Sequence, residues 1–300
     1  MVVKPKLITL IMPAYNEEKN IAEAINSVLS QKYENFELLI VDDGSTDKTG
    51  QIVNDLAIRH SEKITFFQPG KIGKNAAFNL AANHAKGDWF YFMGADDLLP
   101  PDALQNWMKY VEQKDSNKRI AVCGRMKVFS TNKKYDRLIL PKNKKTFNWS
   151  GPLTLMSKGM LSEVTPIPTK YPNEDTWWSL CIRFFAEERI RIDDIIVYYR
   201  IHEGNAISRN SNYSIFNDKY HSRQIAIEEF LKRYKKRLKQ EEQKELSTEI
   251  MLENYRYNGE MLKIIFKINC GLKKKVRAVF FSNALFFKIK KKLDRLMLGH

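Results

Sequence analysis

Three acidic pairs stand beside apolar segments of this sequence, and they are Asp42-Asp43, Asp96-Asp97 and Glu174-Asp175. The first two come after the apolar runs FELLIV and WFYFM, and the third precedes an aromatic-rich segment. Carboxylates in such places can bind a divalent cation, accept a hydrogen bond from a ring N–H group, or take a proton from a hydroxyl. A single pair suits a turn or a helix cap equally well, so the prediction of a site depends on all three.

The apolar runs are predicted to be strands of one sheet. Segments 7–12, 36–41, 64–67 and 89–93 are short and largely apolar, which is typical of buried parallel strands. Between them, apolar residues recur at helical spacing. This alternation predicts an α/β fold with a mostly parallel, Rossmann-like central sheet and helices on both faces. Open sheets of this kind bind ligands at the carboxyl ends of their strands, where the acidic pairs lie.

The alternation continues to about residue 212. We expect a strand over 121–129, an irregular stretch over 130–170, a helix over 176–189 and a strand over 195–199. After residue 212 the pattern becomes helical and charged, with one long helix expected over 219–257.

The charge of the chain is distributed unevenly. Its 300 residues carry 50 Lys+Arg and 35 Asp+Glu, a net charge of +15. Residues 231–300 hold 19 basic and 7 acidic residues, a net charge of +12, so residues 1–230 are nearly neutral. We therefore expect two domains, 1–215 and 216–300, the second being a helical basic extension. No nucleic-acid-binding motif accompanies the basic extension, and no nucleic-acid partner is expected.

The cysteines and the hydropathy of the chain argue against three further classes of protein. The three cysteines are scattered and lack CxxC spacing, which argues against a disulfide framework and a zinc site. No window approaches 18 consecutive apolar residues, so no transmembrane helix is expected. A reducing cytoplasm is the expected location.

Five motifs occur in order at predicted strand ends or helix starts, and they are Pro13-Ala14-Tyr15-Asn16, VDDGSTD at 41–47, Ala95-Asp96-Asp97, Glu174-Asp175 and Tyr199-Arg200-Ile201-His202. With these motifs, residues 5–205 resemble glycosyltransferase family 2, whose members are inverting enzymes of GT-A fold, and in particular its bacterial surface-polysaccharide type. The stretch IMPAYNEEKNIAEAINSVLSQKYENFELLIVDDGSTDKT is similar to the family's N-terminal signature almost throughout. The resemblance implies a nucleotide-sugar donor, a divalent metal and a cytoplasmic catalytic domain.

The resemblance assigns the nucleotide base to the first two motifs. Pro13, Ala14 and Tyr15 would line the base pocket, and Asp43 would accept a hydrogen bond from the base, which for uracil is its N3–H. Tyr15 is also suited to simple packing beside the sheet. Asp42 is expected to brace the turn rather than to contact the donor.

The resemblance assigns the metal to the third and fifth motifs. Asp97 would bind Mn²⁺ or Mg²⁺, which are hard cations that prefer oxygen ligands, and Asp96 would contact the ribose or the metal shell. His202 would ligate the metal or offset the charge of the leaving group. Many members have a further Asp at the position of Gly94, and its absence here puts strict metal dependence in question.

The diphosphate and the acceptor are assigned to the remaining motifs. Many family members have an Arg where this chain has Phe78, and Lys74 is expected to supply the missing positive charge, unless it is simply a surface lysine. Asp175 is the candidate general base, with Glu174 beside it to orient the loop or contact the acceptor. Capping of the helix that follows is compatible with this role. The segment 149–152, with Trp149, Gly151 and Pro152, is expected to form the acceptor-side floor.

The basic tail has the composition of a membrane-binding segment. Residues 261–300 hold 11 basic residues and 1 acidic residue, and lysine clusters flank the apolar sequence AVFFSNALFF. An interfacial helix on an anionic membrane surface requires this combination. The alternatives are a tail that folds back over the catalytic domain and, more remotely, a nucleic-acid-binding segment.

The sequence as a whole predicts a hexosyl- or N-acetylhexosaminyltransferase. It would move a sugar from a nucleoside-diphosphate sugar, with a UDP-sugar favoured, to a hydroxyl of a glycan or lipid-linked acceptor. The expected location is peripheral, on the inner face of the cytoplasmic membrane, in polysaccharide biosynthesis. Two alternatives stay open, a catalytically silent nucleotide-sugar-binding module and a membrane adaptor that acts through the basic tail.

Overall fold

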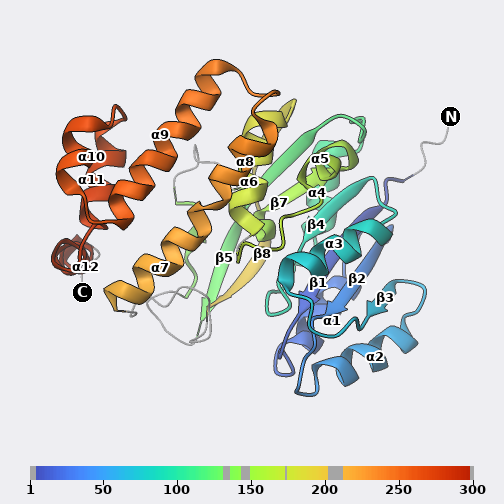
Figure 1. Cartoon of the computed structure of the whole chain (residues 1–300). Helices are drawn as coiled ribbons and strands as arrows, with labels where there is room; N and C mark the ends of the chain where they lie inside the picture. The colour runs from blue at the N-terminus through green and yellow to red at the C-terminus, as the bar shows by residue number, and fades with distance from the viewer. Residues whose placement is uncertain (1–4, 131–135, 143–148, 173, 202–211, 298–300) are drawn as a thin grey trace. The chain divides into compact units, whose positions relative to one another are not determined.

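The structure is a computed structural model that describes residues 5–130, 136–142, 149–172, 174–201 and 212–297. The chain divides into two compact units, Met1–Asn205 and Ala206–His300 (Figure 1). The first unit contains the sheet, and the helices of the second unit pack on one another.

The first unit is built on a mixed sheet whose strands are β1 (Ile8–Ala14), β2 (Phe36–Asp42), β3 (Ile64–Phe67), β4 (Trp89–Phe92), β5 (Ile120–Ser130), β6 (Ile139–Leu140), β7 (Thr154–Ser157) and β8 (Glu188–Ile201). Their order across the sheet is β3-β2-β1-β4-β7-β5-β6, and β8 pairs with β5. The run β3-β2-β1-β4 is parallel throughout. Strand β7 is antiparallel to both β4 and β5, whereas β8 is parallel to β5. The predicted α/β class with a mostly parallel sheet is confirmed.

Helices cover this sheet because each has one apolar face. They are α1 (Ile21–Leu29), α2 (Thr49–Arg59), α3 (Lys74–His84), α4 (Ala103–Val111), α5 (Lys158–Val164) and α6 (Glu174–Phe185), with a 3₁₀ turn, η1, at Gly151–Leu153. In α1, Ile21, Ala24, Ile25 and Val28 repeat at the spacing of one helix face, and all four are buried. These four residues belong to the same hydrophobic core as the strands.

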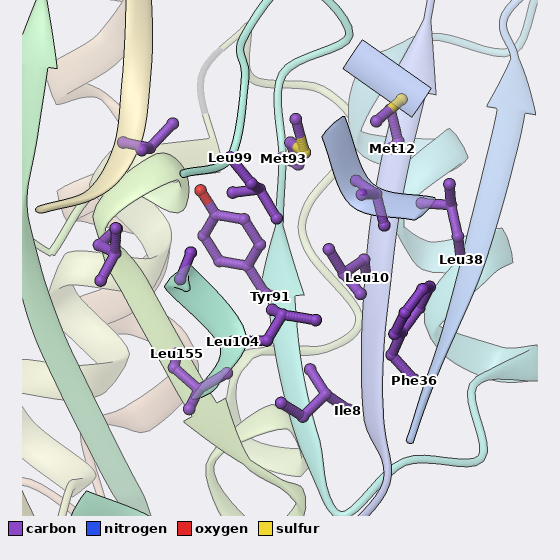
Figure 2. Packing of buried hydrophobic residues seen from close by; sticks show 14 of the residues in the cluster. Ile8, Leu10, Met12, Phe36, Leu38, Tyr91, Met93, Leu99, Leu104 and Leu155 are labelled. Carbon is purple, nitrogen blue, oxygen red and sulfur yellow. The ribbon is translucent and has the colours of Figure 1, made fainter. Parts of the chain in front are cut away.

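The core lies along strands β1, β2 and β4. Figure 2 shows Leu10 of β1, Leu38 of β2 and Tyr91 of β4 among the packed side chains. Tyr91 also meets Trp107 of α4 edge to face, with ring centroids 4.6 Å apart. Burial of one such side chain contributes about 1.5–3 kcal/mol, so these strands hold their carboxyl ends firmly in place.

Two predicted elements of the first unit were wrong. The stretch 130–170 is not simply irregular, because β7 lies in the middle of the sheet between β4 and β5. Its four residues, TLMS, are too few to produce a periodic signal. Helix α6 ends at Phe185, and β8 begins at Glu188 rather than near residue 195. The start of β8 alternates charged and apolar residues, and its pairing with β5 contains register shifts.

The second unit consists of α7 (Tyr213–Gln224), α8 (Ala226–Tyr234), α9 (Gln240–Tyr257), α10 (Met261–Lys267), α11 (Leu272–Phe280) and α12 (Ala284–Met297). The long helix predicted over 219–257 is therefore three helices, and AVFFSNALFF is divided between α11 and α12. Buried Leu238 and Ser282 occupy the turns at two of these breaks. Among the described residues, every helix is too short or too polar to span a bilayer.

Arg256 organises the second unit. Its side chain is buried and forms two hydrogen bonds of 2.7 Å to the carboxylate of Glu253. It also donates to Asn217 Oδ1 on α7 and to the carbonyl of Phe281, between α11 and α12. A buried cation with this many acceptors ties α7, α9 and the α11–α12 turn together.

Candidate active site

The parallel pairing of β1 with β2 places the Pro13–Asn16 motif beside the VDDGSTD motif. Ala14 pairs with Asp42 at the carboxyl ends of β1 and β2, so Tyr15 and Asp43 leave the sheet side by side. The N–H of Asp43 donates to the carbonyl of Ala14 at 2.8 Å. Tyr15 is about half exposed, while Asp43 is buried, so an aromatic face stands beside a buried acceptor.

The carboxylate of Asp43 is engaged by the loop before α3. Its Oδ1 accepts the N–H groups of Ile72 (2.8 Å) and Gly73 (2.6 Å), and its Oδ2 lies 2.9 Å from Lys71 Nζ. The same ammonium lies 3.2 Å from the centroid of the Tyr15 ring. Lys71 thus covers the ring face on which a base would stack. Sequence reasoning assigned no role to Lys71, because a contact across 28 residues leaves no local signal.

Asp42 has a different environment from Asp43. Its side chain is buried, and its Oδ1 accepts the N–H of Ser45 at 2.9 Å within the turn that follows β2. Its role is to close that turn.

The acidic pair after β4 forms a compact oxygen cluster. A Cβ placed on Gly94 would lie 2.8 Å from Asp96 Oδ1 and 2.9 Å from Asp97 Oδ2, so both oxygens converge on one point. A side chain at position 94 would therefore require the two carboxylates to move. Asp97 is 1% exposed and accepts the N–H of Arg200, at the end of β8, at 3.0 Å.

Electrostatics at this cluster fit a bound cation. Burial, and then the charge of Asp96, raise the pKa of the Asp97 carboxyl well above its usual range, while Arg200 opposes the shift. Two converging carboxylate oxygens are hard ligands of the kind that Mn²⁺ and Mg²⁺ prefer. The predicted ligand His202 lies outside the described residues, and within those residues there is no cluster of three or more potential metal-binding side chains.

Arg200, to which the sequence analysis assigned no role, makes further contacts. Its Nε donates to the carbonyl of Asp96 at 2.8 Å, and its Nη2 lies 2.6 Å from Glu23 Oε2 on α1. Together with the backbone bond to Asp97, these contacts fix the loop after β4 between β8 and α1. The YRIH motif could have pointed to this role.

Lys74 connects the start of α3 to the start of α6. Its Nζ lies 2.5 Å from Glu174 Oε1, and Glu174 is buried at the start of α6. Loss of solvation acts to lower the pKa of Lys74, but the carboxylates of Glu174, Asp175 and Asp96 raise it overall. One cation therefore stands among carboxylates from two different motifs.

Phe78, the other departure from the family pattern, belongs to the core. It is 3% exposed and meets both Phe92 of β4 and Trp178 of α6, with centroids 5.1 and 5.3 Å away. Phe92 and Trp178 are themselves 4.6 Å apart. An arginine at this position would require a different packing of α3 against α6.

Asp175 is held by the segment predicted to form the acceptor floor. Its Oδ1 accepts the N–H of Gly151 at 2.9 Å. A Cβ on Gly151 would lie only 2.5 Å from Cζ3 of Trp178, so the backbone of η1 rests directly on that indole. The neighbouring Pro152 accepts the hydroxyl of Tyr91 at 2.9 Å, and Trp149 packs against the core. The segment 149–152 is therefore fixed by its contacts with the core of the first unit.

This close packing gives a first prediction. Gly151→Ala should displace η1 and weaken its bond to Asp175, and we expect a tenfold to hundredfold loss of turnover, because a hydrogen bond to a charged group is worth about 1.5–3 kcal/mol. Trp178→Phe removes the clashing ring carbons and should restore much of the loss in the double variant. Steady-state turnover of the single and double variants checks this. A double variant no better than Gly151→Ala would contradict it.

Two asparagines of α3 support the loop that leads to α6. Asn75 Nδ2 donates to the carbonyls of Pro168 (2.9 Å) and Tyr171 (2.8 Å). One turn later, Asn79 donates to the carbonyl of Ile167 (2.8 Å) and accepts its N–H (2.7 Å). These bonds span about ninety residues of sequence, and no local pattern could have predicted them.

Comparison with known proteins settles the family. The model of "Glycosyl transferase family 2" matches residues 9–169, more than half of the chain. The chain belongs to this family. The resemblance that the sequence motifs suggested is confirmed, and it places the chain among the glycosyltransferases.

Individual relatives and solved structures agree with this assignment. An uncharacterized glycosyltransferase of Haemophilus influenzae is 36% identical over 141 residues, which cover 45% of this chain and 56% of the relative. The putative glycosyltransferase EpsE of Bacillus subtilis is 38% identical over 108 residues, 35% of this chain and 38% of EpsE. The matched segments thus span about half or less of these relatives. TarS of S. aureus, solved with UDP-GlcNAc, has a TM-score of 0.61 at 19% identity, covering 94% of this chain and 80% of that one. Likeness at this level confirms the GT-A fold.

Proposed function

We propose that this family 2 member is an inverting glycosyltransferase that uses a nucleoside-diphosphate sugar. One observation carries the proposal: the carboxyl ends of β1, β2 and β4 and the start of α6 present, at one edge of the sheet, an exposed aromatic ring beside a buried carboxylate, two converging carboxylates and the carboxylate of Asp175. The charges of both Asp96 and Asp175 raise the pKa of Lys74, so this lysine interacts with the loop after β4 and with the start of α6.

The donor would lie across the ends of β1, β2 and β4. Its base would stack on Tyr15 in place of Lys71 and contact Asp43, and a UDP-sugar is the donor we favour because a uracil N3–H suits a carboxylate acceptor. Lys74 supplies positive charge close to the expected diphosphate. Solved relatives of the same fold were crystallised with UDP-GlcNAc, UDP, and GDP-Man with Mn²⁺, which makes such donors reasonable candidates.

The cation site and the base divide the chemistry. Asp97 and Asp96 would hold Mn²⁺ or Mg²⁺, which, when bound, stabilises the negative charge of the diphosphate leaving group. Asp175 would take the proton of the acceptor hydroxyl as it attacks the anomeric carbon from the face opposite the diphosphate, which inverts the configuration. The Gly151 N–H binds Oδ1 of Asp175 and so fixes the orientation of the carboxylate. The acceptor would be a glycan or lipid-linked sugar that lies over η1.

A donor screen tests the proposal. The full chain is heated with a panel of UDP-, GDP-, dTDP- and CMP-sugars, with and without Mn²⁺, and the unfolding temperature is recorded. A donor at about a hundred times its dissociation constant stabilises by ~2.7 kcal/mol, which such a measurement detects. We expect a UDP-sugar to give the largest shift and to release UDP when acceptor is added. Binding without turnover across an acceptor panel would favour a silent binding module, and no binding would refute the proposal.

A further inference from the structure

The second unit exposes far more large apolar side chains than the first. In the part of the chain that the structure describes, fifteen large hydrophobic residues are exposed, and eight of them lie within 262–293. Phe266 is 79% exposed, Leu272 is 77% exposed and Leu285 is 65% exposed. A concentration of this kind marks an interaction surface rather than ordinary surface scatter.

These residues form strips on three successive helices. On α10 the exposed residues are Leu262, Ile265 and Phe266, while Ile264 is buried. On α11 they are Leu272 and Val276, four residues apart, and Ala278 is buried. Each helix thus packs inward through one face and carries a second apolar strip that remains exposed.

Helix α12 repeats the pattern. Leu285, Ile289 and Leu293 recur every four residues and are all exposed, whereas Phe287 is buried and contacts Phe216 of α7, with centroids 4.6 Å apart. The second unit therefore already has an aromatic core that includes Phe287. We name the eight exposed residues of α10, α11 and α12 the apolar strips, and they are Leu262, Ile265, Phe266, Leu272, Val276, Leu285, Ile289 and Leu293.

Basic side chains accompany the apolar strips. Exposed lysines include Lys267 on α10, Lys273 on α11 and Lys288 on α12. Residues 261–300 carry 11 basic residues and 1 acidic residue. A partner that accepts both exposed aliphatic or aromatic side chains and a dense positive field must be apolar beneath a negatively charged surface.

We propose that α10, α11 and α12 dock on an anionic lipid bilayer surface, with the apolar strips inserted at the headgroup–acyl boundary and the lysines on the lipid phosphates. The structure refines the sequence-based expectation of an interfacial helix within residues 261–300, since the surface spans three short helices and its most exposed apolar side chain, Phe266, lies on the first of them. Docking is independent of glycosyl transfer, and it can be tested without turnover.

Vesicle sedimentation of the full chain tests this proposal. We expect wild-type protein to bind vesicles of phosphatidylcholine with phosphatidylglycerol, to bind pure phosphatidylcholine weakly, and to lose binding as salt rises. The triple variant Phe266→Ser/Leu272→Ser/Leu285→Ser should bind at least about tenfold more weakly. The triple variant Lys267→Gln/Lys273→Gln/Lys288→Gln should lose about fivefold per lysine, or roughly a hundredfold in total.

Matched controls use equally exposed residues of the first unit. Ile58→Ser on α2 removes a side chain that is 69% exposed, and Lys86→Gln/Lys109→Gln/Lys118→Gln removes three exposed lysines. Neither should alter vesicle binding, and circular dichroism should show every variant to be folded. Unchanged binding by the apolar or the lysine variant would overturn the proposal. So would wild-type protein that ignores vesicles but dimerises through the apolar strips in sedimentation velocity, because the occupant would then be a second copy.

Discussion

Asp175→Asn should lower the turnover of sugar transfer by about 10²–10⁴-fold at saturating donor, the range that a general base contributes. Asparagine has nearly the same size as aspartate and keeps an oxygen that can accept the Gly151 N–H, so the packing at the start of α6 should be preserved. The loss would therefore come from the missing base and not from a displaced η1 or α6. Release of the nucleoside diphosphate, measured with the donor found in the screen, checks the prediction.

Donor binding separates this outcome from a structural defect. The thermal shift caused by donor and Mn²⁺ should be unchanged in Asp175→Asn, because the proposed donor position lies on the other motifs. Asp102→Asn is a suitable control, since Asp102 stands at the start of another helix, α4, and pairs with Lys32 at the surface. Turnover of Asp175→Asn within about twofold of Asp102→Asn would remove Asp175 as the base.

Asp97→Asn should reduce turnover by about a hundredfold or more, because a metal at the leaving group is worth several kcal/mol and each 1.36 kcal/mol is tenfold in rate. The introduced amide retains an oxygen that can accept the Arg200 N–H, so the loop after β4 should keep its position. The variant should also need more Mn²⁺ to reach half of its maximal rate. Nucleotide release measured against Mn²⁺ concentration, with a chelator as the zero point, tests both effects.

The opposite end of β4 supplies the control. Asp88 lies just before the strand, and its Oδ2 accepts the N–H of Leu7 at 3.0 Å. Asp88→Asn changes a carboxylate in the same strand environment but away from the carboxyl edge, and its Mn²⁺ dependence should match the wild type. If Asp97→Asn also titrates like the wild type, the cation does not lie on Asp97.

Those parts of the fold that depend on local patterns could be predicted from the sequence. Strands β1, β2 and β4 are largely apolar, and acidic residues follow β2 and β4 closely, so the edge that carries Tyr15, Asp43 and Asp97 could be located directly. Strand β7, only four residues long, and the three-way division of 219–257 could not, because the signals that mark them are very short.

Contacts between distant segments account for most of what was missed. Lys71 meets Asp43, Gly151 meets Asp175, and Arg200 meets Asp97, and the last pair is separated by 103 residues. Each depends on how elements far apart in the sequence pack together, which a single sequence does not specify. The surroundings of Gly94 and Phe78, two carboxylates and an aromatic cluster respectively, also became apparent only in the structure.

The asparagine bridge between α3 and the loop before α6 has a consequence for motion. That loop could open only by exposing the buried amide of Asn75 and by breaking both bonds of Asn79 to Ile167. Opening would break these hydrogen bonds together, so α3 and the start of α6 should open and close as one cooperative unit. A ligand that orders α3 would then also order Asp175, even if no atom of that ligand touches α6.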